Sequence, residues 1–272
     1  MPRSPSAAPG RRVDAARGSG GGGVSRVRGA DNGRVLLLAF DTATPAVTVA
    51  LRGDEGVLAE HTEVDARRHG ELLAPGIEKV LTQAARSRAE LTGVAVGVGP
   101  GPFTGLRVGL VTARALGDAL GIPVYGVCTL DILAAEVAGA GAGGVMAGAT
   151  PVGEAETRLD GGFAVATDAR RREVYWALYD LAGRRESEPA VDRPGEIFAR
   201  LEGLPVAGEG PRLYPEQFPD ALEPKLPSAG VLAELTAGLL RDDPAALLPP
   251  QPLYLRRPDA VEPGARKPVS QA

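Results

Sequence analysis

The stretch VLLLAFDTAT, residues 35–44, decides the fold of this chain, because an unbroken apolar run in it stops at an aspartate. Its first six residues are apolar, which is typical of a strand buried on both faces of a sheet. A turn follows Asp41, and the apolar run 46–51 predicts a second strand. The same order of strand, aspartate, turn and strand returns at 163–179, around Asp168. The sequence therefore predicts an internal duplication.

Outside these two units, apolar strands alternate with helical patterns, which indicates a layered α/β fold. Further strands are expected at 57–62, 91–98, 122–127 and 205–207. Helices are expected at 68–84, from 103 to about 120, at 130–138, at 194–201 and at 229–240. This order of elements predicts two related domains, with the second one reduced.

The predicted boundaries follow from shifts in composition. The first domain is expected at 35–128 and the second at 129–257, with the glycine-rich residues 139–162 as a flexible insertion. Residues 1–33 hold six arginines, two aspartates and an unbroken glycine run, so we expect a disordered basic extension. Residues 258–272 are expected to form a disordered tail.

Composition excludes several classes of protein. The 272 residues carry a net charge of −4, and because residues 1–33 sum to +4, the remainder carries −8. An acidic body is a poor match for nucleic acid on its own. The single cysteine, Cys128, excludes an internal disulfide framework, and His61 and His69 are too far apart for a zincin motif. No apolar run reaches the roughly 18 residues of a membrane span, so a cytoplasmic protein without membrane contact is expected.

The two aspartates resemble the arrangement in the actin-like ATPase superfamily, where a hairpin aspartate orients magnesium or water beside phosphate. Backbone N–H groups approach phosphate most easily in glycine-rich turns. Here the first turn holds Ala43 and Pro45, and the second holds the run 170–172 of three arginines. We therefore interpret Asp41 and Asp168 as an eroded nucleotide site, with Asp41 as a simple turn former being the alternative.

Small residues recur at every fourth position of the predicted helix after residue 102. Glycine inside a helix costs roughly 1 kcal/mol relative to alanine, so a ridge of small residues indicates close backbone approach. Two neighbours fit this ridge: the sheet of the same domain, or another helix at a subunit interface. The ridge is formed by Gly105, Gly109, Ala113 and Gly117.

Several motifs together resemble the TsaB family, also called YeaZ. The match runs in order over about residues 35–257, and its most specific block is GPGPFTG at 99–105. The other motifs are FDTAT at 40–44, His69 with LLAP at 72–75, GVCTL at 126–130, DAR at 168–170, EVYW at 173–176 and PLYLR at 252–256. The resemblance implies an actin-like (ASKHA, ribonuclease H-like) α/β fold.

The resemblance also implies a function. Members of this family act in making N6-threonylcarbamoyladenosine at position 37 of tRNAs that read ANN codons. The implied role is that of a non-catalytic partner that binds and activates the TsaD transferase, with the TsaE ATPase joining the complex and tRNA bound mainly through it. Where TsaD places two metal-binding histidines, this sequence has Thr129 and Leu133, so neither a metal nor catalytic residues are expected.

The family associates through the two helices of the first domain. The residues implied at that interface are Leu72, Leu73, Ile77, Val80, Gly105, Gly109, Leu110, Ala113 and Gly117. No cofactor is expected to be required, although weak nucleotide binding stays open. Two alternatives also stay open: a homodimer formed through the same helices, and an independent actin-like ATPase or small-molecule kinase.

Overall fold

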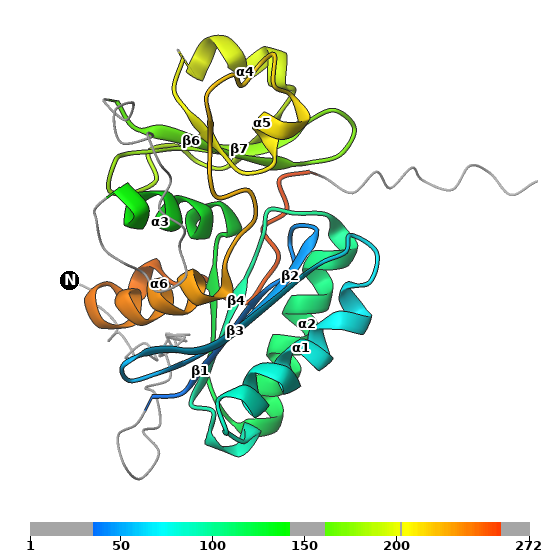
Figure 1. Cartoon of the computed structure of the whole chain (residues 1–272), viewed down its shortest axis with the longest axis vertical. Helices are drawn as coiled ribbons and strands as arrows, with labels where there is room; N and C mark the ends of the chain where they lie inside the picture. The colour runs from blue at the N-terminus through cyan, green and yellow to red at the C-terminus, as the bar shows by residue number, and fades with distance from the viewer. Residues whose placement is uncertain (1–34, 142–160, 202, 257–272) are drawn as a thin grey trace, which may run out of the picture.

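The computed structural model describes residues 35–141, 161–201 and 203–256, and it shows two lobes, each built on one five-stranded sheet (Figure 1). The predictions for 1–33, for 258–272 and for most of the insertion lie outside the described residues. The first sheet has the order β3-β2-β1-β4-β5. Its strands are β1 (Leu37–Asp41), β2 (Ala46–Gly53), β3 (Gly56–Val64), β4 (Gly93–Gly97) and β5 (Val124–Val127).

The second sheet repeats the topology of the first. Followed from β8, its order β8-β7-β6-β9-β10 has two antiparallel pairs and then two parallel pairs, as the first sheet has when followed from β3. The strands are β6 (Phe163–Asp168), β7 (Val174–Tyr179), β8 (Ala190–Asp192), β9 (Val206–Ala207) and β10 (Ala221–Leu222). Its outer strands are short, which agrees with a reduced second copy. Two related mixed sheets with helices form an actin-like α/β fold.

Two long helices cover one face of the first sheet. They are α1 (His69–Gln83) and α2 (Phe103–Leu120), and they lie side by side on the outside of this lobe (Figure 1). Their apolar side chains pack on Leu38 and Phe40 of β1, whose alternate residues point to this face. Gly121 ends α2 in the left-handed conformation, with φ of 66°.

The helices α3 (Thr129–Gly141) and α6 (Ala229–Asp242) lie between the two sheets (Figure 1). The helix α3 packs on β6 and β7 of the second sheet, whereas α6 packs on Leu37 and Ala39 of the first. The expected second domain therefore includes a helix that completes the first lobe. Periodicity shows that α6 has an apolar face but not which sheet covers it. The outer face of the second sheet carries α4 (Pro194–Leu201) and α5 (Gly210–Leu213).

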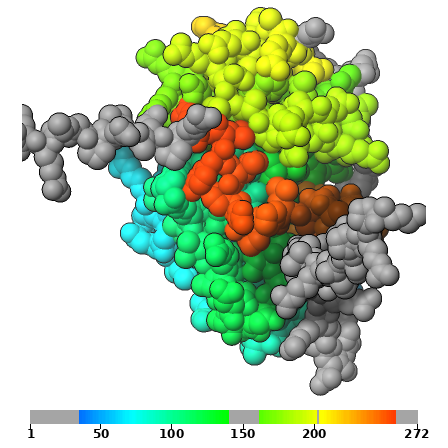
Figure 2. All heavy atoms as spheres, turned by 180° about the vertical axis from the view of Figure 1, so that it is seen from behind, coloured from blue at the N-terminus to red at the C-terminus, as the bar shows by residue number. Residues whose placement is uncertain are grey.

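The end of the described chain crosses the seam between the lobes, where Figure 2 shows it in orange and red. Leu253 N donates to Val98 O at 2.8 Å, and Arg256 Nη1 donates to Ala169 O at 2.9 Å. These bonds join the first lobe to the turn after β6. None of the described helices is both long and apolar enough to cross a membrane.

Candidate functional site

The turn after β1 is closed around the Asp41 side chain. Asp41 is fully buried; its Oδ2 accepts a hydrogen bond from Thr129 Oγ1 at 2.6 Å, and its Oδ1 accepts one from Ala43 N at 2.7 Å. Burial raises the pKa of Asp41, while the hydrogen bonds from Thr129 and Ala43 oppose that rise. Both oxygens of this carboxylate are therefore engaged by hydrogen bonds inside the fold.

Glycines form the wall around this turn. A Cβ at Gly97 would lie 1.6 Å from Asp41 Oδ2, and one at Gly101 would lie 2.2 Å from Ala43 O. Real Cβ atoms do not approach other atoms this closely. The GPGPFTG block therefore brings its backbone against the turn at 41–44.

The same turn holds the start of α2. Thr42 Oγ1 donates to Gly105 O at 2.8 Å and accepts from Gly109 N at 3.0 Å. A Cβ at Gly105 would lie 2.6 Å from Thr42 O, and one at Gly109 would lie 2.5 Å from Thr42 Oγ1. His69 Nε2 bonds to Thr44 O at 2.8 Å, so this histidine anchors α1 to the turn.

The corresponding turn after β6 is more open. Asp168 Oδ1 accepts a hydrogen bond from Arg170 N at 2.7 Å, and its Oδ2 pairs with Arg170 Nη1 at 3.2 Å. The Asp168 side chain is 17% exposed. The three arginines 170–172 are exposed and all have φ between 55° and 62°. The burial of Glu209, followed by its proximity to Asp168, raises the pKa of Glu209. The two halves of the predicted nucleotide site thus differ: the first is sealed and the second is partly open.

The residues predicted to form the subunit interface are buried within the chain itself, and their contact with a partner stays a prediction. All nine are buried; six belong to one apolar core with β1, β2 and β4, and the other three are glycines of the ridge that packs against it. The ridge packs on its own sheet: Gly109 faces Thr42, and a Cβ at Gly117 would lie 2.4 Å from Val124 Cγ2. Helical spacing shows that small residues share a face, but it does not identify the neighbour. The nine are Leu72, Leu73, Ile77, Val80, Gly105, Gly109, Leu110, Ala113 and Gly117.

Sequence reasoning missed the surface that these helices do expose. On α2, Val111 is 67% exposed and Phe103 is 48% exposed. Arg107 lies between them in sequence, places its guanidinium carbon 3.4 Å from the centre of the Phe103 ring and donates to Tyr254 Oη at 3.0 Å. The spacing of residues 103, 107 and 111 was the available signal, since positions four apart share a helix face.

The residues at the positions of the TsaD histidines have structural tasks. Besides its bond to Asp41, Thr129 Oγ1 accepts from Gly99 N at 3.2 Å, and Leu133 is fully buried in the core beside β6. Within the described ranges, no three His, Cys, Asp or Glu side chains gather as a metal site would require. Cys128 is buried, and burial raises the pKa of its thiol to about 12.

A carboxylate pair meets the start of α6. Glu60 Oε1 accepts from Ser228 Oγ at 2.8 Å and from Gly230 N at 3.1 Å. Glu136 of α3 lies beside it, and its Oε2 is buried and makes no hydrogen bond with the described residues. Burial, followed by the charge of Glu60, raises the pKa of Glu136 from its ordinary 4.5 to about 7.

Glu136→Gln is expected to stabilise the protein at pH 8 but not at pH 5. The wild-type carboxyl holds its proton more tightly when folded, so stability is lost as pH rises from about 4.5 to about 7. The difference in pKa corresponds to about 3 kcal/mol, which partial exposure reduces to about 2 kcal/mol. Urea unfolding of both proteins at pH 5 to 8 measures the free energy of unfolding. A difference between variant and wild type that stays the same at every pH would contradict the prediction.

The comparisons with known proteins agree with this architecture. The family model described as "TsaD: tRNA N6-adenosine threonylcarbamoyltransferase" matches residues 56–239. An uncharacterized protein of Mycobacterium tuberculosis is 45% identical over 227 residues, which are 82% of this chain and 93% of that protein. The "tRNA threonylcarbamoyladenosine biosynthesis protein TsaB" of Escherichia coli is 33% identical over 190 residues, covering 66% of this chain and 74% of that protein.

A solved structure extends the likeness to three dimensions. The structure of YeaZ from Pseudomonas aeruginosa superposes with a TM-score of 0.64 and 30% identity, covering 81% of this chain and 100% of that one. A second structure, of an uncharacterized Pseudomonas aeruginosa protein similar to peptidase YEAZ, gives a TM-score of 0.62 and 32% identity, covering 82% and 100%. Both solved chains are thus matched over their full length. The chain accordingly belongs to the TsaB family, also called YeaZ.

Proposed function

We propose that this chain acts in the formation of N6-threonylcarbamoyladenosine in tRNA, at position 37 of tRNAs that read ANN codons, as the non-catalytic partner that binds and activates TsaD. The relatives named TsaB support the pathway. The observation that carries the non-catalytic role is the closed turn around Asp41, where the hydrogen bonds of Thr129 and Ala43 engage both carboxylate oxygens. An independent ATPase or kinase would need this aspartate to face its ligand.

The partner surface proposed here is the outer face of α1 and α2. On α2 it presents Val111 and Phe103, which are exposed apolar side chains, with Arg107 between them. On α1 the exposed residues Ala74 and Pro75 extend it. An apolar centre with arginine and an aromatic side chain is the composition that protein interfaces favour. TsaE would join this pair, and tRNA would be held mainly by the complex.

Val111→Glu is expected to weaken binding of the cognate TsaD at least about ten-fold, because a charge would be desolvated at the centre of the contact. Size-exclusion chromatography with light scattering measures the heterodimer, and titration calorimetry measures the affinity. The matched control is Leu181→Glu, since Leu181 is 51% exposed but lies in the turn between β7 and β8 of the second lobe. Wild-type affinity in Val111→Glu would place the interface elsewhere.

Reconstitution of threonylcarbamoyl transfer by TsaD tests the activating role. Addition of this chain is expected to raise the amount of modified tRNA, and Val111→Glu is expected to reduce that gain in step with its loss of binding. No complex at micromolar concentration would contradict the partnership, whereas a complex without a gain in transfer would contradict activation only. The mass of the chain measured alone distinguishes a homodimer formed through the same helices.

A further inference from the structure

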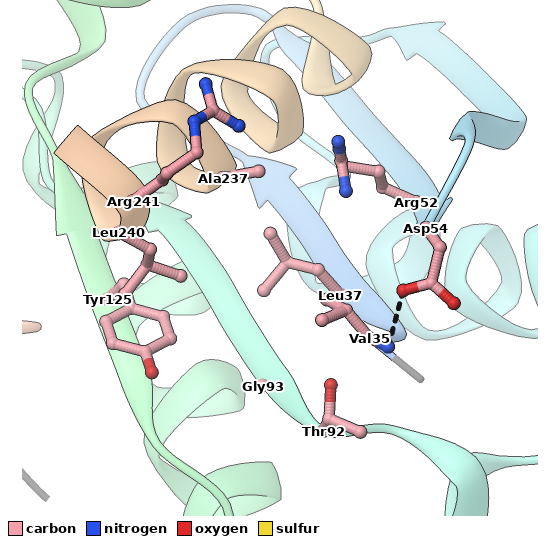
Figure 3. Close-up of a pocket in the computed structure, with 10 residues that line it drawn as sticks. All are labelled: Val35, Leu37, Arg52, Asp54, Thr92, Gly93, Tyr125, Ala237, Leu240 and Arg241. Atoms are coloured by element: carbon pink, nitrogen blue, oxygen red, sulfur yellow. Dashed lines mark hydrogen bonds between the residues drawn. The ribbon is translucent and has the colours of Figure 1, made fainter. Parts of the chain in front are cut away.

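A cavity of about 420 Å³ opens on the face of the first sheet opposite to α1 and α2. Its floor is one row across the sheet, in which Leu37 of β1 pairs with Arg52 of β2 on one side and with Gly93 of β4 on the other. Tyr125 of β5 stands on the same face and borders the row. Figure 3 shows Tyr125 and Arg52 on opposite sides of the cavity, with Leu37 between them.

The helix α6 forms the other wall of this cavity. Ala237, Leu240 and Arg241 line it, and because they are spaced three and four residues apart they share one face of the helix (Figure 3). The side chains of Leu37 and Tyr125 lie over Gly93, since a Cβ at Gly93 would be 3.3 Å from Leu37 Cδ1 and 3.3 Å from Tyr125 Cε2.

Each ionic side chain at the rim of the cavity has a polar partner of its own. Arg52 Nε binds Glu234 Oε2 at 3.0 Å and its Nη1 donates to Gly53 O at 2.8 Å. Asp54 Oδ1 accepts from Val35 N at 2.9 Å. Arg241 Nε pairs with Asp242 at 3.1 Å. A charged ligand would have to compete with these pairs, so the rim favours an uncharged molecule.

One polar group in the cavity wall has no such partner. Tyr125 is 7% exposed, and its hydroxyl oxygen is buried and makes no hydrogen bond with the described residues. A buried polar group left without a hydrogen bond costs about 1–3 kcal/mol. Burial also raises the pKa of Tyr125, so the hydroxyl keeps its proton at neutral pH and can donate it. Thr92 differs, because its hydroxyl bonds to both Leu36 N and Leu36 O.

We propose that this cavity binds a small, uncharged aromatic molecule that carries one hydrogen-bond acceptor. The ring would lie over Leu37 under the α6 residue Ala237. The Tyr125 hydroxyl, which is buried in the free protein, would turn toward the cavity and donate its hydrogen to the acceptor. The volume falls within the range of roughly 300–1,000 Å³ that is usual for small-molecule sites. The site lies on the other face of the sheet from the surface proposed for TsaD, so it does not depend on that function.

Three probes of similar size test the proposal on the isolated full-length protein: benzamide, toluene without an acceptor, and benzoate with a charge. Ligand-observed NMR titrations are expected to give benzamide an affinity of about 1 mM, tighter than the other two. Tyr125→Phe should weaken benzamide about five-fold and leave toluene unchanged, since only a hydrogen bond is lost. Tyr214→Phe, a tyrosine change in the second lobe, should alter neither.

A second test of the proposal fills the cavity with a larger side chain. Ala237→Phe is expected to abolish binding of benzamide and toluene, while Ala199→Phe on the exposed face of α4 should have no effect. Thermal melts verify folding, and Ala237→Leu replaces Ala237→Phe if the larger side chain is not accommodated. The proposal is overturned if the wild type binds none of the probes at several millimolar, if the filled cavity still binds benzamide, or if Tyr125→Phe weakens toluene as much as benzamide.

Discussion

Replacing Gly97 by alanine is expected to leave little folded protein. The new Cβ would lie 1.6 Å from Asp41 Oδ2 and 2.5 Å from Asp41 Cγ, and neither strand can move because β1 and β4 pair directly at the centre of the sheet. The buried Asp41 carboxylate is fixed by two hydrogen bonds, so the clash is expected to lower the free energy of unfolding by more than about 4 kcal/mol. This is a large part of the stability of a typical domain. Urea unfolding and the yield of monodisperse protein measure the effect.

The cause can be separated from a general intolerance of alanine. Gly70→Ala, on the exposed face of α1 where a Cβ would meet nothing within 4 Å, is expected to be neutral or to stabilise by up to about 1 kcal/mol. Asp41→Ala removes the clashing oxygens, so the double variant with Gly97→Ala should lose less stability than the sum of the single changes. Additive losses would show that the contact between Gly97 and Asp41 is not the reason.

The second large effect is expected from Asp41→Asn. Thr129 Oγ1 and Ala43 N both donate to this side chain, so an amide would direct an N–H group at one of the two donors. A buried mismatch of this kind is expected to cost about 2–4 kcal/mol. The matched change, Asp168→Asn, keeps an oxygen for Arg170 N and leaves a partly exposed side chain, so it should stay within about 1 kcal/mol.

Chemical denaturation of the two variants tests this pair of expectations. If both variants lost the same free energy of unfolding, the closed turn at Asp41 and the more open turn at Asp168 would not explain their behaviour. The comparison also bears on the alternative of an independent ATPase. Because Asp41→Asn is expected to lose stability, loss of a nucleotide-dependent activity in that variant would not identify a catalytic aspartate. Asp168→Asn is the more informative change, since its fold should be retained.

The main elements of the fold follow from local patterns. The apolar run ending at Asp41 and its repeat at Asp168 predicted two related units, and the structure has two sheets with the same strand topology. The end of α2 near residue 120 was likewise predicted from a local pattern. The edge strands β8 and β10 were not predicted, because three-residue and two-residue strands are too short to show an alternation. Local signals therefore found the core strands and helices but not the edges of the second sheet.

The candidate site was predicted less well, for a physical reason. The sequence placed Asp41 at the end of a buried strand but did not show that Gly97 and Thr129 would close over it. The exposed face of α2 around Val111 was likewise not identified, although its spacing was visible. Burial is a property of the packed chain, because it depends on which distant atoms occupy the space around a side chain.

The sequence by itself determined the repeated strand and aspartate units, the helical spacing of small residues and the family. Only the tertiary structure decided that the Gly105 and Gly109 ridge packs on Thr42 and its own sheet rather than on a partner. It also decided that α6 completes the first lobe and leaves a cavity beside Tyr125. A pattern of three or four residues fixes which side chains share a face, whereas the neighbour of that face is fixed by contacts between residues far apart in the chain.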